Sequence, residues 1–553
     1  MGKKVLIVGG VAGGASAAAR VRRLDEFAEV VMFERGPHVS FSNCCLPYHL
    51  SGIIENSEDL VLMDPEVFAK QYNIDARVHN EVIAINREEK KVVVKHTVTG
   101  KEYEESYDKL VLSPGARPIL PASIEGITND NVFTVRNVGD IDQIKNYADQ
   151  NNKENIVVVG GGFIGVEVAE NFKMAGKNVT LVEAQNQVMA PFDFDMAQIL
   201  HKELYDNGIN LILSDALAKV TDSEVVLASG KKVAADVVIS AIGVTPETDL
   251  ATAAGLELGV TGGIKVDHNY LTNDKDIYAV GDAIEVFHRI TRKPVRLPLA
   301  GPAQRQARAA ADHMYGRSHN NKGVIGSSIV QAFNLIGAST GLNEKAAQEA
   351  GIPYEVAYTI GGDMVGLMPD ANPLHFKLIF EVPTGRILGA QGIGKGNVDK
   401  RVDIIATMIT MDGTLEDLKE LELCYAPPFG TAKDVVNHTA LVGLNLLYGD
   451  FKQVKVDKVR ELVENDAFIV DCREEDEFEL GHIVNAINIP LSELRQRVDE
   501  IPKDQPVYIH CRSAQRSYNS TRALGHLGYD NVYNISGSFL GVCCYEYYLD
   551  QTT

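Results

Sequence analysis

The chain has 553 residues, of which 45% are hydrophobic and 23% charged, and its formal net charge is −22 at pH 7. This length exceeds one hydrophobic core and indicates three or four domains. The composition is that of a globular protein without an apolar run of membrane-spanning length, so neither a membrane nor, given the negative charge, nucleic acid is an expected partner. The N-terminus lacks a signal-peptide pattern, and the seven cysteines are too few and too irregular for a disulfide scaffold. We therefore expect a cytoplasmic protein with reduced thiols.

The first element is a dinucleotide-binding βαβ unit. A buried-strand pattern at Lys4–Val8 leads into a glycine-rich turn and an alanine-rich helix. The second strand, Glu29–Phe33, ends at Glu34, where such a unit places the carboxylate that accepts the ribose hydroxyls. The glycines of the turn are Gly9, Gly10, Gly13 and Gly14.

A pair of cysteines, Cys44 and Cys45, follows about ten residues after Glu34. Neither has a CxxC or CxxxxC partner. A thiol placed just after a dinucleotide-binding unit suggests a flavin that works with a single redox cysteine. This arrangement points to thiol, disulfide or persulfide chemistry.

A second glycine fingerprint lies between the strand Ile156–Val159 and a helix, and the strand Val179–Val182 then ends at Glu183. Its glycines, Gly160, Gly162 and Gly165, satisfy the complete G-x-G-x-x-G pattern. No arginine follows Glu183 closely, so NADH is favoured over NADPH. Two fingerprints with correctly placed acids favour two nucleotide sites over glycines that are merely structural.

The second βαβ domain is predicted to be inserted into the first. The strands that begin at Leu110 and Val237 each run into a turn and mark the exit and the return, after which Asp282 stands at a strand end, before a helix near Pro302. From about residue 322 the pattern changes to mixed strands and helices.

The last hundred residues are predicted to form a separate domain. A helix is expected at Leu491–Val498, and the strand Val507–His510 delivers the loop Cys511–Arg516 to the mouth of a further helix. The backbone N–H groups of this loop, Arg512, Arg516 and the helix dipole would stabilise a thiolate or the terminal sulfur of a persulfide.

These motifs resemble those of a known fusion. Residues 1 to about 445 resemble the single-cysteine branch of the pyridine nucleotide-disulfide oxidoreductases, and the C-terminal part resembles a rhodanese domain. Together they are similar to coenzyme A-disulfide reductase/rhodanese proteins, which are NADH-dependent persulfide reductases. The resemblance implies an α/β fold with two nested Rossmann-like domains, an α+β dimerisation domain and an α/β rhodanese domain. The expected boundaries are 1–112 with 240–321 for FAD binding, 113–239 for NADH binding, 322–445 for dimerisation, 446–455 for a linker and 456–553 for the rhodanese domain.

The resemblance also assigns roles. Cys44, assisted by Ser40 and Asn43, would be the redox nucleophile, Cys511 the sulfur carrier, and Tyr425 would reach the active site of the neighbouring subunit in a homodimer. The first glycine turn, Glu34, Asp282 and the helix near Ala300 would bind FAD, whereas the second fingerprint and Glu183 would bind NADH. The positions that the family uses for coenzyme A are Ser16, Arg20, Arg23, Lys70 and Lys433.

Three departures from the family pattern affect these assignments. Val11 replaces the middle glycine of the first fingerprint, and Cys45 stands where the family has glycine or alanine. Cys45 is interpreted as a packed thiol rather than as half of a strained Cys44–Cys45 disulfide. Leu367–Met368 replace paired tyrosines before Pro369, which removes hydroxyls expected near the substrate sulfur. The preferred substrate therefore stays open.

The main functional hypothesis is an NADH-dependent FAD enzyme that reduces a coenzyme A persulfide or disulfide, or a polysulfide, and releases thiol and hydrogen sulfide. One alternative is an NADH peroxidase or oxidase that acts through a Cys44 sulfenic acid. Another is a non-catalytic sulfur carrier or sensor. Whether coenzyme A is cofactor or substrate, and whether Cys511 serves Cys44 in the same chain or across a dimer, stays open.

The remaining ligand-type residues are assigned no chemistry. The other cysteines stand in apolar or strand-like contexts and are interpreted as packing residues: Cys424, Cys472, Cys543 and Cys544. The histidines form no cluster with metal-ligand spacing, so no metal is expected.

Overall fold

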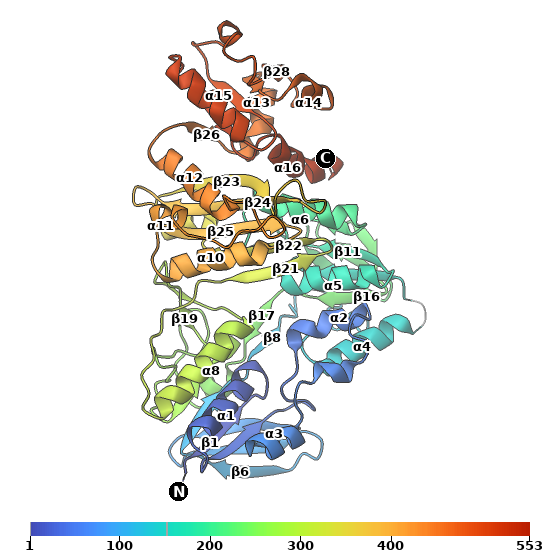
Figure 1. Cartoon of the computed structure of the whole chain (residues 1–553). Helices are drawn as coiled ribbons and strands as arrows, with labels where there is room; N and C mark the ends of the chain where they lie inside the picture. Colours follow the sequence, from blue (N-terminus) through green and yellow to red (C-terminus); the bar gives the residue numbers. More distant parts are fainter. Residues whose placement is uncertain (1, 151–152, 553) are drawn as a thin grey trace. The chain divides into compact units, whose positions relative to one another are not determined.

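The computed structural model describes residues 2–150 and 153–552 (Figure 1). The chain forms two compact units, one from residues 1–184 and 214–324 and the other from residues 185–213 and 325–553. Residues 185–213, expected within the NADH-binding domain, thus belong to the second unit. The boundaries given above for the four predicted domains stay predictions.

The first unit contains a five-stranded parallel sheet in the order β18-β7-β1-β2-β3. Its strands are β18 (Ile277–Ala279), β7 (Lys109–Leu112), β1 (Lys4–Val8), β2 (Glu29–Phe33) and β3 (Asp75–Arg77). Helices α1 (Ala12–Leu24) and α8 (Ala300–Met314) pack together, and their buried alanines permit this close approach. Helix α8 begins two residues before the predicted start at Pro302.

A second parallel sheet in this unit carries the other fingerprint. Its strands β11 (Asn178–Val182), β10 (Asn155–Val159), β16 (Val237–Ser240) and β9 (Val132–Phe133) lie side by side. The antiparallel pair β8 (Ala116–Pro118) and β17 (Val244–Pro246) joins the exit and the return of the chain. This connection confirms the nested Rossmann-like arrangement.

The second unit contains a five-stranded antiparallel sheet. Its order is β21 (Ser328–Ala332), β22 (Leu335–Gly341), β25 (Ile387–Gly394), β24 (Pro373–Glu381) and β23 (Tyr354–Gly362). Helix α10 (Val398–Thr410) packs on β22 and β25, and α12 (Val435–Leu447) on β23 and β24. The mixture of strands and helices predicted for this region is confirmed.

The C-terminal sheet of the same unit is parallel, in the order β26 (Lys452–Val454), β30 (Val532–Ile535), β29 (Val507–His510), β27 (Phe468–Asp471) and β28 (Ile487–Asn488). Strand β26 lies inside the stretch 446–455 that was expected to be a linker. Since β26 pairs with β30, that part of the stretch belongs to the sheet. The predicted helix at Leu491–Val498 is wrong: isolated turns occupy residues 491–496, and a 3-10 helix follows at Val498–Glu500.

A buried ion pair holds together the loops around residues 363–372 and 421–434. Arg401 on α10 is fully buried, donates to the Asp434 carboxylate at 2.9 Å and also donates to the Asp363 carbonyl at 3.1 Å. The Asp434 carboxylate in turn accepts from the Val436 N–H at the start of α12. Removing one partner of a buried ion pair leaves the other charge buried and uncompensated, so loss of either residue is expected to destabilise the fold.

We predict that Arg401→Met destabilises the second unit by about 3–5 kcal/mol, since the Asp434 carboxylate stays buried without its partner. Calorimetry should show that the second unit of the variant unfolds at a lower temperature than that of the parent protein. The matched control is Arg386→Met, which removes a half-exposed pair with Glu381 and should cost only about 0–1 kcal/mol. Equal shifts for the two variants would contradict this account.

Candidate active site

The first glycine turn packs so closely against the chain's own backbone that two of its positions have no space for a side chain. Gly9 has φ +95°, and a Cβ on Gly14 would lie 1.8 Å from the Gly9 carbonyl oxygen. The Glu34 carboxylate accepts from the N–H groups of Gly10 and Gly36, both at 2.9 Å. The turn, the N-terminus of α1 and the acid at the end of β2 therefore lie together, as a dinucleotide phosphate and ribose require.

Asp282 supplies a second feature that fits a flavin nucleotide. It lies in the 3-10 helix Gly281–Ala283 just after β18, and burial raises the pKa of its carboxyl group. The N–H of Gly281 donates to Gln306 on α8 at 2.8 Å, which ties this turn to the helix that begins at Ala300. A half-buried carboxylate at this position can accept hydrogen bonds from the hydroxyl groups of a bound ligand.

The second fingerprint repeats the same geometry. A Cβ on Gly165 would lie 1.8 Å from the Gly160 carbonyl oxygen, and the Gly161 N–H donates to Glu183 at 2.7 Å. A Cβ on Gly162, by contrast, would meet no atom of the chain within 4 Å. The protein itself does not require glycine at that position, so the open space there fits a bound pyrophosphate.

The segment with Cys44 is attached to the first glycine turn. Ser40, a buried non-glycine residue at φ +50°, donates its N–H to the Gly10 carbonyl at 2.8 Å, and its own carbonyl accepts from Leu62 N–H at 2.9 Å. Asn43 and Cys44 follow in the 3-10 helix Asn43–Cys45. Cys44 is exposed, but desolvation of its sulfur by neighbouring atoms, and then the negative charge of Glu167, raises the pKa of its thiol.

Glu167 is a site residue that the sequence analysis missed. It lies on α5 (Phe163–Met174), two residues after Gly165, and α5 packs against α2 (Leu46–Leu50), which begins directly after Cys45. Burial, with a contribution from Glu170, raises the pKa of Glu167 to about 7. Its signal in the sequence was an acid on an otherwise apolar stretch of the fingerprint helix.

The basic residues assigned to coenzyme A have different surroundings. Arg20 pairs with Asp312 on α8, and Lys70 pairs with Glu66, whereas Arg23 is exposed. The neighbouring Arg22 is buried and donates to five backbone carbonyls, so its role is structural. Ser16 is half-buried on α1, and Lys433 is exposed in the second unit. The coenzyme A assignments stay predictions.

Two exposed loops of the second unit carry the residues expected near the substrate. Tyr425 is 50% exposed, as a residue that reaches a neighbouring subunit would be, and Leu367 is 92% exposed. The Val365 N–H donates to the Pro427 carbonyl at 3.2 Å, which joins the two loops. Leu367–Met368 therefore lie on the loop beside Tyr425.

Cys511 lies at the end of β29, where the chain turns into α15 (Gln515–His526). Its N–H donates to Ser538 Oγ at 3.0 Å, and Ser517 Oγ donates to its sulfur at 3.6 Å. The neighbouring Cys472 thiol, together with the N–H groups of Ser517 and Ser513, lowers the pKa of the buried Cys511 thiol. A stabilised thiolate suits sulfur transfer.

The two arginines of the loop differ. Arg516 pairs with Glu477 at 2.5 Å, and this hydrogen bond is the main cause of the raised pKa of Arg516. Arg512 is exposed. Both catalytic assignments stay predictions.

The packing interpretation of the other cysteines was incomplete. Cys472 is buried but contacts the Cys511 sulfur, whereas Cys424 and Cys543 are exposed. Exposed thiols do not pack in a core, so the packing prediction was wrong for those two.

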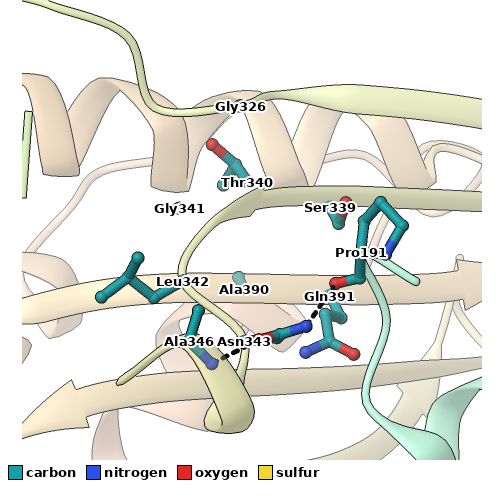
Figure 2. A pocket seen from close by; sticks show the side chains of 10 residues that line it. All are labelled: Pro191, Gly326, Ser339, Thr340, Gly341, Leu342, Asn343, Ala346, Ala390 and Gln391. Atoms are coloured by element: carbon teal, nitrogen blue, oxygen red, sulfur yellow. Dashed lines mark hydrogen bonds between the residues drawn. The ribbon is translucent and has the colours of Figure 1, made fainter. Parts of the chain in front are cut away.

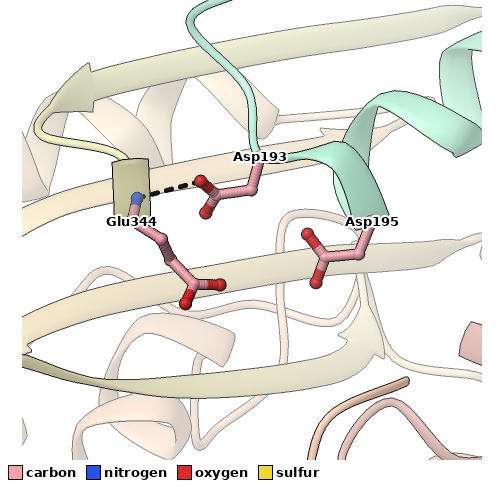
Figure 3. Close-up of side chains that lie close together, drawn as sticks. All are labelled: Asp193, Asp195 and Glu344. Carbon is pink, nitrogen blue, oxygen red and sulfur yellow. Dashed lines mark hydrogen bonds between the residues drawn. The ribbon is translucent and has the colours of Figure 1, made fainter. Parts of the chain in front are cut away.

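One group of acids in the described part of the chain is close enough to hold a metal ion: Asp193, Asp195 and Glu344 (Figure 3). The Lys377 ammonium, however, lies 3.1, 2.8 and 2.6 Å from their respective carboxylates. The lysine already supplies the positive charge. The group is therefore explained as a buried ion-pair network.

A cavity of about 200 Å³ in the second unit contains none of the expected site residues (Figure 2). Its polar side chains already have partners, since Asn343 bonds to Ala346 and Ala190 and Gln391 to Asp193. The polar side chains that line this cavity already have hydrogen-bond partners, so the cavity indicates no ligand.

In the part of the chain that the structure describes, none of the helices has the length and apolar character that a membrane span requires.

Family models match three regions of the chain. Residues 3–307 match the pyridine nucleotide-disulphide oxidoreductases, residues 329–435 the dimerisation domain of that family, and residues 455–543 a rhodanese-like domain. The chain therefore belongs to the pyridine nucleotide-disulphide oxidoreductases and carries a rhodanese-like domain. The predicted fold class is confirmed.

Individual relatives extend this finding. A coenzyme A disulfide reductase of Staphylococcus haemolyticus is 35% identical over 436 residues, which are 79% of this chain and 98% of the relative. The crystal structure of reduced Bacillus anthracis CoADR-RHD matches with a TM-score of 0.95 and 44% identity, over 99% of this chain and 98% of the other. A NAD-dependent persulfide reductase from A. fulgidus matches with a TM-score of 0.93 and 35% identity, over 98% and 99%.

We predict that Glu167→Gln lowers the pKa of the Cys44 thiol, because the substitution removes a nearby negative charge. Since the pKa of Glu167 is about 7, the wild-type carboxylate is charged above that pH, and the difference between the proteins should grow as the pH rises through 7. The measurement is the pH dependence of Cys44 alkylation in a Cys45→Ser background. The exposed Glu66→Gln serves as control, and superimposable Cys44 profiles for Glu167→Gln and its parent would contradict the prediction.

Proposed function

We propose that this protein is an NADH-dependent FAD reductase of persulfide, polysulfide or coenzyme A disulfide substrates, with a rhodanese domain that carries sulfane sulfur. The observation that carries the proposal is the backbone bond from Ser40 to Gly10, which attaches the Cys44 segment to the first glycine turn. The coenzyme A disulfide and persulfide reductase relatives support the substrate class. We further infer a homodimer, in keeping with the matched dimerisation domain, and a cytoplasmic location, where thiols stay reduced.

The two nucleotide sites would supply the electrons. Gly9, Gly14, Glu34 and Asp282 would hold FAD, and Gly160, Gly162, Gly165 and Glu183 would hold NADH. When bound, the flavin passes the two electrons of NADH on to oxidised sulfur. The chain itself contributes the positions of both nucleotides and of the thiol.

Cys44 would attack the substrate sulfur. As a thiolate it displaces a thiol from a disulfide or persulfide, and the leaving group must take up a proton. Glu167 exerts a charge effect on Cys44 and has a pKa of about 7, so it holds or releases a proton near neutral pH. Cys511, with its lowered pKa, would accept sulfane sulfur and present it as a persulfide.

The test is anaerobic NADH oxidation by the purified protein, with coenzyme A persulfide, coenzyme A disulfide, polysulfide or peroxide as acceptor. We expect sulfide release from a persulfide or polysulfide, and Cys44→Ser should lower that rate by about 10³-fold or more, as loss of a nucleophile does. Cys424→Ser is the matched control, since that exposed thiol is assigned no chemistry. Turnover with peroxide alone would favour the NADH peroxidase or oxidase alternative.

A further inference from the structure

Cys472 and Cys511 stand at matching positions just beyond two neighbouring parallel strands. In the β27–β29 pair, Asp471 is in register with His510, and the Cys472 N–H donates to the His510 carbonyl at 2.9 Å. Neighbouring strands lie about 4.8 Å apart, and residues in register project from the same face of a sheet. This spacing falls within the roughly 4.4–6.8 Å between Cα atoms that a disulfide spans.

The two thiols also share an enclosed environment. Cys472 is 0% and Cys511 1% exposed, and both belong to one apolar cluster with Val470, Ile509 and Leu524. Within this cluster the Cys472 thiol and the Cys511 sulfur lie close enough to affect each other's pKa. Burial strongly raises the pKa of Cys472, so this thiol keeps its proton beside the Cys511 sulfur.

We propose that Cys472 is an internal resolving thiol for a persulfide on Cys511. This inference rests on the proposed sulfur-carrying role of Cys511. The Cys472 thiol passes its proton to the persulfide and attacks the Cys511 Sγ as a thiolate, a Cys472–Cys511 disulfide forms, and the bond between Cys511 Sγ and the outer sulfur breaks. The outer sulfur leaves as sulfide with the proton of Cys472. The two electrons that reduce the sulfane sulfur come from the two cysteines, which end as the disulfide.

The consequence is that the Cys511 persulfide can lose its outer sulfur without an acceptor thiol. When an acceptor thiol arrives first, the outer sulfur is transferred and Cys511 is regenerated as a thiolate. When no acceptor arrives, Cys472 expels the sulfur as sulfide and closes the site until an external thiol reduces the disulfide. The rhodanese domain would thus hold sulfane sulfur only for a limited time.

The experiment uses the full-length holoprotein, reduced and anaerobic, without NADH and in a Cys44→Ser background. The protein is loaded with inorganic tetrasulfide and desalted, and then sulfide, free thiols and non-reduced peptides are followed over time. We expect one sulfide for each loaded Cys511, the loss of two thiols, and a peptide pair joined through Cys472 and Cys511. In Cys472→Ser and Cys472→Val the Cys511 persulfide should persist without a joined pair, while Cys543→Ser should behave like its parent.

The outcomes separate this inference from the function on which it rests. A stable Cys511 persulfide in the parent protein, with Cys472 still free, would overturn the resolving role and leave the sulfur-carrier proposal intact. If no Cys511 persulfide forms in Cys472→Ser or Cys472→Val, the carrier proposal and this inference both fail. The peptide analysis of the parent protein tests the resolving role even if both Cys472 variants fold poorly.

Discussion

The functional groups of this protein depend on one constraint, which is that parallel strands end together at one edge of a sheet. Glu34 follows β2, Asp282 lies just after β18, and Glu183 follows β11. Cys472 and Cys511 follow β27 and β29 in the same way. Because the buried strands must stay in register to fill the core, these residues are held at or near strand ends: four of them directly follow their strand, and Asp282 lies three residues beyond β18. These groups are therefore positioned by the packed strands, whereas the Cys44 segment is held by the backbone bond from Ser40 to Gly10.

The two thiols proposed to carry the chemistry have pKa values that their surroundings shift in opposite directions. Desolvation of its sulfur, followed by acidic neighbours, raises the pKa of Cys44, whereas hydrogen-bond donors lower that of Cys511 despite deeper burial. Burial disfavours a thiolate in both places, and only the donors around Cys511 compensate. Cys511 is thus ready to accept sulfur by itself. Protonation of Glu167 would remove one of the negative charges that raise the pKa of Cys44.

Strand ends and glycine turns could be predicted from the sequence, whereas side-chain contacts between distant segments could not. Lys4–Val8, Glu29–Phe33 and Val507–His510 were predicted with the bounds that the structure has, because short apolar runs that end at a glycine or a charge are local signals. The helix expected at Leu491–Val498 failed because turns bury Leu494 equally well. Glu167 and Cys472 were missed because their importance comes from the side chains they meet. No spacing in the sequence shows those neighbours.

The burial of Cys511 limits how sulfur can leave the rhodanese domain. A persulfide that only transfers its sulfur outward must expose that sulfur to an acceptor, but the Cys511 residue is 1% exposed. Its outer sulfur would extend past the N–H groups of Ser513 and Ser517, whereas its inner sulfur stays beside Cys472. An external thiol therefore meets the outer sulfur, and the internal thiol meets the inner one. Since attack on the inner sulfur releases sulfide and attack on the outer sulfur transfers it, the position of the attacking thiol decides between release and transfer.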